Sequence, residues 1–192
     1  MKVLVAMSGG VDSSVTAYLL KEQGYDCIGV TMKLYDGEDQ RESTCCSLRD
    51  VEDAKSVCHR LGIPHYTFNF TGDFDREVIA PFIRSYEQGR TPNPCIDCNR
   101  RLKFQRLYHR AMELGCDYIA TGHYVRRVVE PDGTVSLHKA LDDQKEQSYV
   151  LYNMTQAQLQ RTLFPLGELT KPQVREIAER EGFLNAKKHD SQ

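Results

Sequence analysis

Short apolar runs alternate with longer segments of helical periodicity through the first 121 residues, and this order constrains the fold more than any other feature. The strand-like runs are residues 2–6, 27–34, 65–70 and 117–121. The helix-like segments are residues 11–23, 47–61, 74–88 and 99–114. Because strands separated by helices are joined by right-handed crossovers, the order predicts an α/β fold, a parallel sheet with helices on both faces.

The chain departs from this order in two places. Residues 89–98, "GRTPNPCIDC", predict a loop, because two prolines and a glycine interrupt any regular element. After residue 121, Pro131-Asp132-Gly133 joins two alternating segments and predicts a small hairpin. Helices near 155–161 and 171–182 are expected to form a C-terminal helical segment.

The sequence "SGGVDSS" (residues 8–14, the glycine turn) lies between the first predicted strand and helix. In parallel sheets this is the edge where ligands bind, and a helix N-terminus with glycine amides and serine hydroxyls favours an anion. The turn lacks the lysine of a Walker A loop. Asp12 repels phosphate unless Mg²⁺ lies between them. The alternative is a plain turn with Ser8 as the helix cap.

Charge is uneven along a chain whose net charge is −2. Residues 36–53 hold seven acidic and two basic residues, and residues 84–110 hold seven arginines or lysines and two acidic residues. The basic block indicates an anionic partner on one face, although a solvated helix face explains it equally well.

The seven cysteines are an odd number and follow no secretory signal, which predicts a cytoplasmic location. No apolar stretch is long enough to span a membrane, so no membrane association is expected. Cys27, Cys58 and Cys116 fall in predicted strands or helices and are expected in the core.

Cys95 and Cys98 form a C-x-x-C pair directly before the basic helix. A helix N-terminus and neighbouring cations lower a thiol pKa and favour the reactive thiolate. Half of a zinc site is the alternative, but the remaining candidates, Cys45 and Cys46, are adjacent and suit a tetrahedral ion poorly.

The glycine turn resembles the PP-loop (SGGxDS) of ATP pyrophosphatases, which cleave ATP between the α and β phosphates and adenylate a substrate. Further stretches resemble the tRNA-specific 2-thiouridylases, which replace O2 of the wobble uridine with sulfur. In order along the chain they are "AMSGGVDSSV", "GVTMKLYD", "CCSLRDVEDAKSVCHRLGIPHY", "GRTPNPCIDCNRRLKF", "ATGHYVR", "DQKEQSYVLY" and "FPLGELTKPQVREIA".

This resemblance implies roles for individual residues. ATP would contact Ala6, Met7, Ser8, Gly9, Gly10, Val11, Asp12, Ser13, Met32 and Gly122. The target base would lie near Asn93, Pro94 and Cys95, and tRNA would contact Lys145, Glu146 and Gln147. Asp12 and Cys98 would be catalytic, with Cys98 attacking a persulfide sulfur carried by a second cysteine. His123 either touches the nucleotide or base or packs internally.

The implied activity is that of an ATP-dependent tRNA-uridine 2-sulfurtransferase. Adenylation would turn the uridine oxygen into a leaving group, AMP, and a sulfur nucleophile would then attack the activated carbon. The implied cofactors are ATP and Mg²⁺. The implied partners are tRNA, attracted by the basic helix, and a sulfur-carrier or persulfide-donor protein.

The chain departs from the family pattern in two ways. Asn93-Pro94-Cys95 stands where the family commonly has Asn-Pro-Asp, so Cys95 and Cys98 are possible ligands of an iron–sulfur cluster. The sequence stops at "HDSQ", before the family's second cysteine and tRNA-binding domains. We therefore expect a PP-loop catalytic domain over 1–165 and the start of a helical linker over 166–192.

Two other functions stay open from the sequence alone. One is a different PP-loop enzyme that adenylates a small molecule. The other is a zinc- or cluster-binding RNA module with a vestigial nucleotide site.

Overall fold

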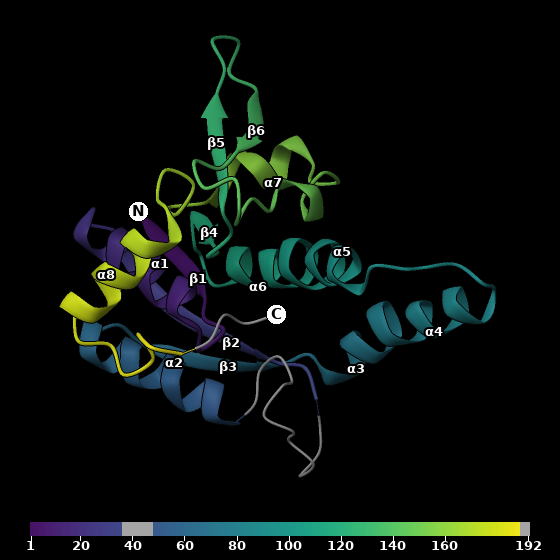
Figure 1. The fold of residues 1–192 in the computed structure, drawn as a ribbon, viewed down its shortest axis with the longest axis horizontal. Helices are drawn as coiled ribbons and strands as arrows, with labels where there is room; N and C mark the ends of the chain where they lie inside the picture. Colours follow the sequence, from purple (N-terminus) through teal and green to yellow (C-terminus); the bar gives the residue numbers. More distant parts are fainter. Residues whose placement is uncertain (36–47, 189–192) are drawn as a thin grey trace.

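A five-stranded parallel sheet forms the centre of the chain, in the order β3-β2-β1-β4-β7 (Figure 1). The structure is a computed structural model that describes residues 1–35 and 48–188. The strands are β1 (Lys2–Ala6), β2 (Asp26–Lys33), β3 (His65–Asn69), β4 (Tyr118–Ala120) and β7 (Thr162–Leu163). The predicted parallel sheet and its first four strands are confirmed, and β7 is an addition.

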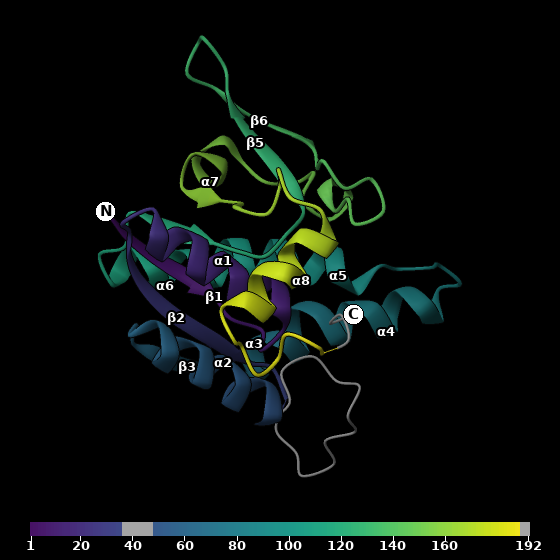
Figure 2. The same cartoon turned by 60° about the vertical axis from the view of Figure 1, so that its left-hand side comes forward.

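Helices cover both faces of this sheet, as the alternation predicts. One face carries α1 (Val11–Glu22), α2 (Leu48–Leu61) and α8 (Lys171–Arg180). The other carries α3 (Thr71–Phe74), the π-helical segment η1 (Asp75–Ile79), α5 (Pro94–Asp97), the π-helical segment η2 (Cys98–Leu107) and α6 (Tyr108–Glu113). The helix α4 (Ala80–Glu87) follows η1 and buries none of its residues. In Figures 1 and 2, α4 reaches away from the sheet.

Side chains of β1 alternate between two hydrophobic clusters. Val3 and Val5 face the cluster formed with α1, α2 and α8, whereas Leu4 faces the cluster formed with η2 and α6. All three side chains are fully buried. Successive side chains of a strand point to opposite faces, so this central strand must be apolar throughout.

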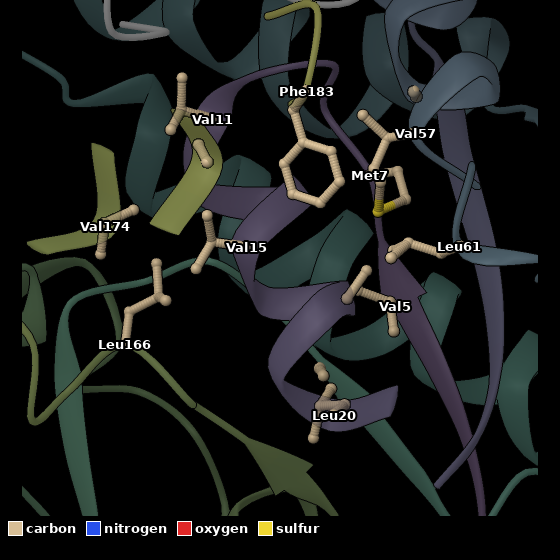
Figure 3. Packing of buried hydrophobic residues seen from close by; sticks show 14 of the residues in the cluster. Val5, Met7, Val11, Val15, Leu20, Val57, Leu61, Leu166, Val174 and Phe183 are labelled. Atoms are coloured by element: carbon tan, nitrogen blue, oxygen red, sulfur yellow. The ribbon is translucent and has the colours of Figure 1, made fainter. Parts of the chain in front are cut away.

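The segment after residue 165 packs against α1 as part of the first cluster. Val174, Ala178 and Phe183 are buried there, and Figure 3 shows the Phe183 ring lying among side chains of α1, α2 and the end of β1. The side chain of Gln173 accepts a hydrogen bond from the Thr170 amide and caps α8. The predicted role of 166–192 as the start of a linker stays a prediction.

A two-stranded antiparallel sheet lies outside this core. It consists of β5 (Val125–Val129) and β6 (Val135–Lys139), and it confirms the predicted hairpin. Gly133, in the turn between the two strands, adopts a φ of 83°, a left-handed conformation that favours glycine. The 3-10 helix η3 (Ser148–Val150) and α7 (Gln156–Gln160) follow, and both views show the hairpin projecting from the body.

The predicted loop over 89–98 is wrong from Pro94 onward, because α5 begins there and continues into η2. Pro94 occupies the first helical position, where its missing N–H costs nothing. The Asn93 side chain caps the helix by accepting a hydrogen bond from the Cys95 amide at 3.0 Å. Cys95 and Cys98 therefore lie within the first turns of a helix and not before it.

Among residues 1–35 and 48–188, no helix combines the length and apolar character that crossing a membrane requires.

Candidate active site

The glycine turn joins β1 to α1 at the carboxyl end of the sheet. Gly9 adopts a φ of 76°, and a Cβ atom there would lie 2.2 Å from the backbone oxygen of Asp50. Only glycine tolerates both the left-handed conformation and this close contact with α2. The side chains of Met7 and Val11 point into the core, so these two residues offer only backbone groups to a ligand.

Serine hydroxyls gather within the turn, where Ser8 is exposed and Ser13 is buried. The Ser8 and Ser13 hydroxyl oxygens lie 3.3 Å apart, and the Gly10 amide donates to the Ser8 hydroxyl at 3.4 Å. The Ser13 hydroxyl donates to the Gly10 carbonyl at 3.0 Å. Gly10 is the N-cap residue of α1, so Ser8 is not the helix cap.

The first turn of α1 therefore presents its amides without a competing side-chain cap from any described residue. Such amides, together with the positive end of the helix dipole, bind phosphate and other anions. The geometry supports the anion-binding interpretation of the turn.

Asp12 is the one carboxylate within the turn, and two residues from distant parts of the chain bind it. Lys171, at the start of α8, places its Nζ atom 2.7 Å from Asp12 Oδ1 and 2.9 Å from Oδ2. The hydroxyl of Tyr124 donates to Asp12 Oδ1 at 2.8 Å. Sequence reasoning assigned no role to Lys171 or Tyr124, although both lie inside stretches that carry the family resemblance.

Gly122 packs directly behind Asp12. A Cβ atom on Gly122 would lie 2.9 Å from the Asp12 carbonyl carbon and 3.0 Å from the Ser13 amide nitrogen. Any side chain at residue 122 would therefore push the start of α1 out of place. This close packing explains why glycine is needed at residue 122, and contact of Gly122 with ATP stays a prediction.

His123 is a packed histidine rather than an exposed contact. Its Nδ1 atom lies 2.7 Å from the Thr121 hydroxyl, and the rings of Phe104 and Phe164 lie beside it. Burial, followed by the charge of Lys103, lowers the pKa of His123 well below its ordinary value of 6.5. The imidazole is therefore neutral at physiological pH.

Ala6 and Met32 lie near the carboxyl ends of the neighbouring strands β1 and β2. Ala6 is half-buried, and Met32 is 7% exposed against the second cluster. Both therefore lie at the edge where parallel sheets bind ligands, and their contact with a nucleotide stays a prediction.

The predicted tRNA-contacting turn is joined to the Asp12 site by hydrogen bonds. The Gln147 side chain accepts from the Tyr124 amide, and the Gln147 amide donates to the Tyr124 carbonyl, both at 3.0 Å. The Lys145 amide donates to the Asp142 carbonyl, and the Asp142 carboxylate accepts from the Lys171 amide at 2.8 Å. The turn thus supports the two residues that hold Asp12.

Glu146 belongs to the same turn and stabilises it locally. Its carboxylate accepts a hydrogen bond from the Ser148 amide at 2.6 Å. Contact of Lys145, Glu146 and Gln147 with tRNA stays a prediction.

The cysteine pair lies at the start of the helix formed by α5 and η2. Cys95 is exposed, whereas Cys98 is half-buried against the second hydrophobic cluster. Other cysteines differ: burial raises the pKa of the Cys27 thiol to about 11 and that of the Cys58 thiol to about 12. These two thiols are inert core groups, as the sequence predicts, and Cys116 is also buried.

Acidic neighbours offset part of the basic block. Arg106 pairs with Asp73 at 3.4 Å, Arg110 pairs with Glu113 at 2.7 Å, and Arg101 lies 4.0 Å from Glu77. Arg100 is exposed on η2, and Arg84 and Arg90 are exposed on or after α4. The positive surface available to an anionic partner is therefore smaller than the sequence count suggests.

Within 1–35 and 48–188, no group of three or more His, Cys, Asp or Glu side chains is placed to hold a metal ion. Cys45 and Cys46 lie outside the described residues. A cluster held by Cys95 and Cys98 therefore stays a prediction.

Comparison with known sequences gives matches along the whole chain. A family model described as tRNA methyl transferase HUP domain matches residues 1–192. Proteins named tRNA-specific 2-thiouridylase MnmA from Lachnoclostridium phytofermentans and Clostridium botulinum (strain Alaska E43) are 53% identical over 195 residues and 54% identical over 194 residues. All of this chain is covered, and it spans 55% and 54% of those proteins, about half their length.

Solved structures with little sequence identity share the fold. A 4-thiouridine synthetase–RNA complex with bound ATP matches with a TM-score of 0.65 and 19% identity, over 96% of this chain and 42% of that chain. NMN synthetase from Francisella tularensis matches with a TM-score of 0.56 and 18% identity, over 98% of this chain and 65% of that chain. These likenesses confirm the predicted α/β fold.

Proposed function

Because the chain belongs to the family described as tRNA methyl transferase HUP domain, we propose that it binds ATP at the glycine turn and activates a tRNA uridine for sulfur transfer. The relatives at 53% and 54% identity carry the name tRNA-specific 2-thiouridylase. The proposed product is 2-thiouridine at the wobble position, formed with release of AMP and pyrophosphate.

The observation that carries this proposal is the arrangement around Asp12. Uncapped amides of α1 and the hydroxyls of Ser8 and Ser13 lie on the same turn as a carboxylate that is already paired with Lys171. Amides and hydroxyls suit the phosphate oxygens of ATP, and Lys171 offsets the negative charge that Asp12 brings to the site. A simple structural turn requires neither feature.

The first reaction is an adenylation. The uridine O2 atom attacks the α-phosphorus of ATP, the bond between the α-phosphorus and the bridging oxygen breaks, and pyrophosphate leaves with the electron pair. The turn amides bind the phosphates and orient the α-phosphorus toward the base. One carboxylate with phosphate oxygens also suits Mg²⁺, which would be held by Asp12 and would offset phosphate charge.

The second reaction transfers sulfur. The terminal sulfur of a cysteine persulfide attacks C2 of the adenylated uridine, and AMP leaves. The Cys98 thiolate then attacks the inner sulfur of the persulfide, which forms a disulfide and leaves the terminal sulfur on C2. A persulfide-donor protein and a second cysteine are part of this proposal. Cys98 follows α5 in the second turn of that helix, and its side chain is half-buried.

Product analysis tests the proposal. We would incubate the anaerobic chain with Mg²⁺-ATP, with and without unmodified tRNA, and separate AMP from ADP. AMP formation that rises with tRNA supports both the bond cleaved and the acceptor. Asp12→Asn should abolish AMP formation, whereas Cys98→Ser should retain it and lose only thiolation in a protein that carries the second cysteine.

The remaining outcomes separate the alternatives. AMP formation without any dependence on tRNA favours an enzyme that adenylates a small molecule. Formation of ADP alone contradicts the PP-loop interpretation. A stoichiometric metal ion combined with no ATP binding favours a metal- or cluster-binding RNA module.

A further inference from the structure

The carbonyl group of Gly9 receives hydrogen bonds from two residues near the end of the described chain. Asn185 donates from Nδ2 at 2.9 Å, and Lys188 donates from Nζ at 3.4 Å. Asn185 Nδ2 also donates to the Ser14 hydroxyl at 2.9 Å. Two side chains more than 170 positions away in sequence thus hold one peptide group of the glycine turn.

This contact determines where the next amide points. In a planar trans peptide, the carbonyl of one residue and the N–H of the following residue point in opposite directions. The Gly9 carbonyl faces Asn185, so the Gly10 N–H faces the other side, where it donates to the Ser8 hydroxyl at 3.4 Å. That side carries the hydroxyls of Ser8 and Ser13.

Two consecutive glycines would otherwise leave this peptide group free to rotate. Glycine populates positive and negative φ about equally, so a Gly-Gly peptide flips more easily than any other. A flipped peptide would present the Gly9 carbonyl oxygen, an acceptor, to the incoming phosphate. The contacts of Asn185 and Lys188 oppose that flip.

The surroundings of both residues indicate a positional role. Lys188 is anchored to α2 by Asp50 Oδ1 and Asp53 Oδ2, each at 2.6 Å. Asn185 is 3% exposed, and its Oδ1 atom is buried without a hydrogen-bond partner among the described residues. A buried unpartnered acceptor costs stability, so a residue kept only for packing would be apolar.

We propose that Asn185 and Lys188 are positioning residues that hold the Gly9–Gly10 peptide in the orientation that directs the Gly10 amide at the β- and γ-phosphates of ATP. This inference rests on the proposed function, because it requires ATP at the glycine turn. The proposal adds Asn185 and Lys188 to the residues that determine the affinity of the chain for the triphosphate of ATP.

The test compares ATP with AMP, which lacks the β- and γ-phosphates. Calorimetry would measure the dissociation constants of both nucleotides for the 192-residue chain and for Asn185→Leu and Lys188→Met. Leucine branches at the same carbon as asparagine and has the same number of side-chain heavy atoms, and it removes both the donor to Gly9 and the unpartnered oxygen. Because leucine is the larger side chain, thermal unfolding of Asn185→Leu would show whether the buried site accommodates it. We expect each variant to bind ATP about tenfold more weakly and AMP with unchanged affinity, since one hydrogen bond to a charged group is lost.

Asn153→Leu is the matched control. Asn153 also has a buried unpartnered side-chain atom, Nδ2, but precedes α7, away from the turn. This variant should keep the ratio of ATP to AMP affinity of the parent chain. If Asn185→Leu does not fold, Lys188→Met carries the test alone, because Lys188 is only half-buried.

The outcomes separate the two proposals. If the parent binds ATP and both variants keep the parent's ratio of ATP to AMP affinity, the positioning role is wrong and the proposed function stands. If the parent binds no ATP, both proposals are overturned. A parallel loss of ATP and AMP affinity also contradicts the positioning role, since it indicates general damage to the site.

Discussion

Lys171 Nζ lies 2.7 Å from Asp12 Oδ1, so the first residue of α8 neutralises the carboxylate of the glycine turn across 159 positions of sequence. The Lys171 side chain is 10% exposed and that of Asp12 is 29% exposed. A pair this shielded from water interacts more strongly than a surface ion pair. It places the Lys171 Nζ atom beside the proposed phosphate site.

We expect Lys171→Met to lower tRNA-dependent AMP formation by roughly 10²–10³-fold, because phosphate charge that develops during adenylation loses its cation. The unfolding free energy should fall by roughly 1–3 kcal/mol, less than for a fully buried pair, because Asp12 keeps some contact with water. Lys171→Arg should retain part of the rate of AMP formation and part of the lost unfolding free energy. Rates from product analysis and denaturant unfolding check this, and an unchanged rate in Lys171→Met would show that the pair is only structural.

Gly122→Ala should destabilise the chain and weaken ATP binding. Its methyl group would lie 2.9 Å from the backbone of Asp12, so the start of α1 must move. Such overpacking costs roughly 1–3 kcal/mol. Gly72→Ala is the matched control, since a Cβ atom there meets nothing within 4 Å. Thermal unfolding and ATP titration of both variants measure the difference, and equal behaviour would contradict the close packing.

The free energy of unfolding should decrease as the pH is lowered through the titration range of His123. The folded chain holds His123 neutral because burial lowers its pKa well below 6.5, whereas the unfolded chain takes up a proton near pH 6.5. The contribution of neutral, buried His123 to the free energy of unfolding is therefore fully present above pH 6.5. It is lost as the pH falls below 6.5, by at most about 1.4 kcal/mol per pH unit. His123→Gln should show a shallower slope than the parent between pH 7.5 and 5. Urea unfolding at several pH values checks this, and parallel slopes would count against it.

Thiol labelling should discriminate sharply among the cysteines. Cys95 is exposed, whereas burial raises the pKa of Cys27 to about 11 and that of Cys58 to about 12. Brief treatment with iodoacetamide at pH 8 should modify Cys95 and leave Cys27 and Cys58 unmodified until guanidinium unfolds the chain. Peptide mass spectrometry gives the extents, and equal labelling of Cys58 and Cys95 in the folded chain would refute the burial.

Removal of one exposed arginine should weaken tRNA binding in a salt-dependent way. Arg100 lies exposed on η2, so Arg100→Ala should lower affinity about three- to tenfold and reduce the slope of log affinity against log salt by about one. Arg180→Ala removes the same charge from α8 on the opposite face of the sheet and should change neither quantity. Filter binding at several salt concentrations separates the two, and equal losses would indicate a nonspecific charge effect.

Periodicity predicts the centre of the sheet well because burial on both faces makes β1 and β4 largely apolar, whereas the edge strand β3 is mostly exposed. It misses β7, because two residues carry no pattern. It also misplaces the start of the basic helix, because Pro94 is compatible with the first helical position and Asn93 supplies the cap. Local composition alone does not distinguish a loop that contains proline from a helix that begins with it.

The glycine turn was predictable because its chemistry is local, with glycines, hydroxyls and a carboxylate within seven residues. The groups that complete the site were not. Lys171, Tyr124 and Asn185 reach the turn only through packing of α8 and the end of β4 against α1. No spacing rule connects residues so far apart, and only the resemblance around "TGHY" and "LTKPQ" marked two of these regions.

The packing of α8 on α1 has a consequence for the order of events during protein synthesis. A ribosome releases the glycine turn at the very start of translation, but the partners of Asp12 and Gly9 emerge only after residues 171–188 have been made. Until then, a growing chain leaves the Asp12 carboxylate without Lys171 and leaves the apolar side of α1 that packs on α8 uncovered. Contacts between the two ends of a chain are slow to form, so nucleotide affinity should arise late and all at once. The proposed phosphate site is therefore expected to form only after α8 has been synthesised.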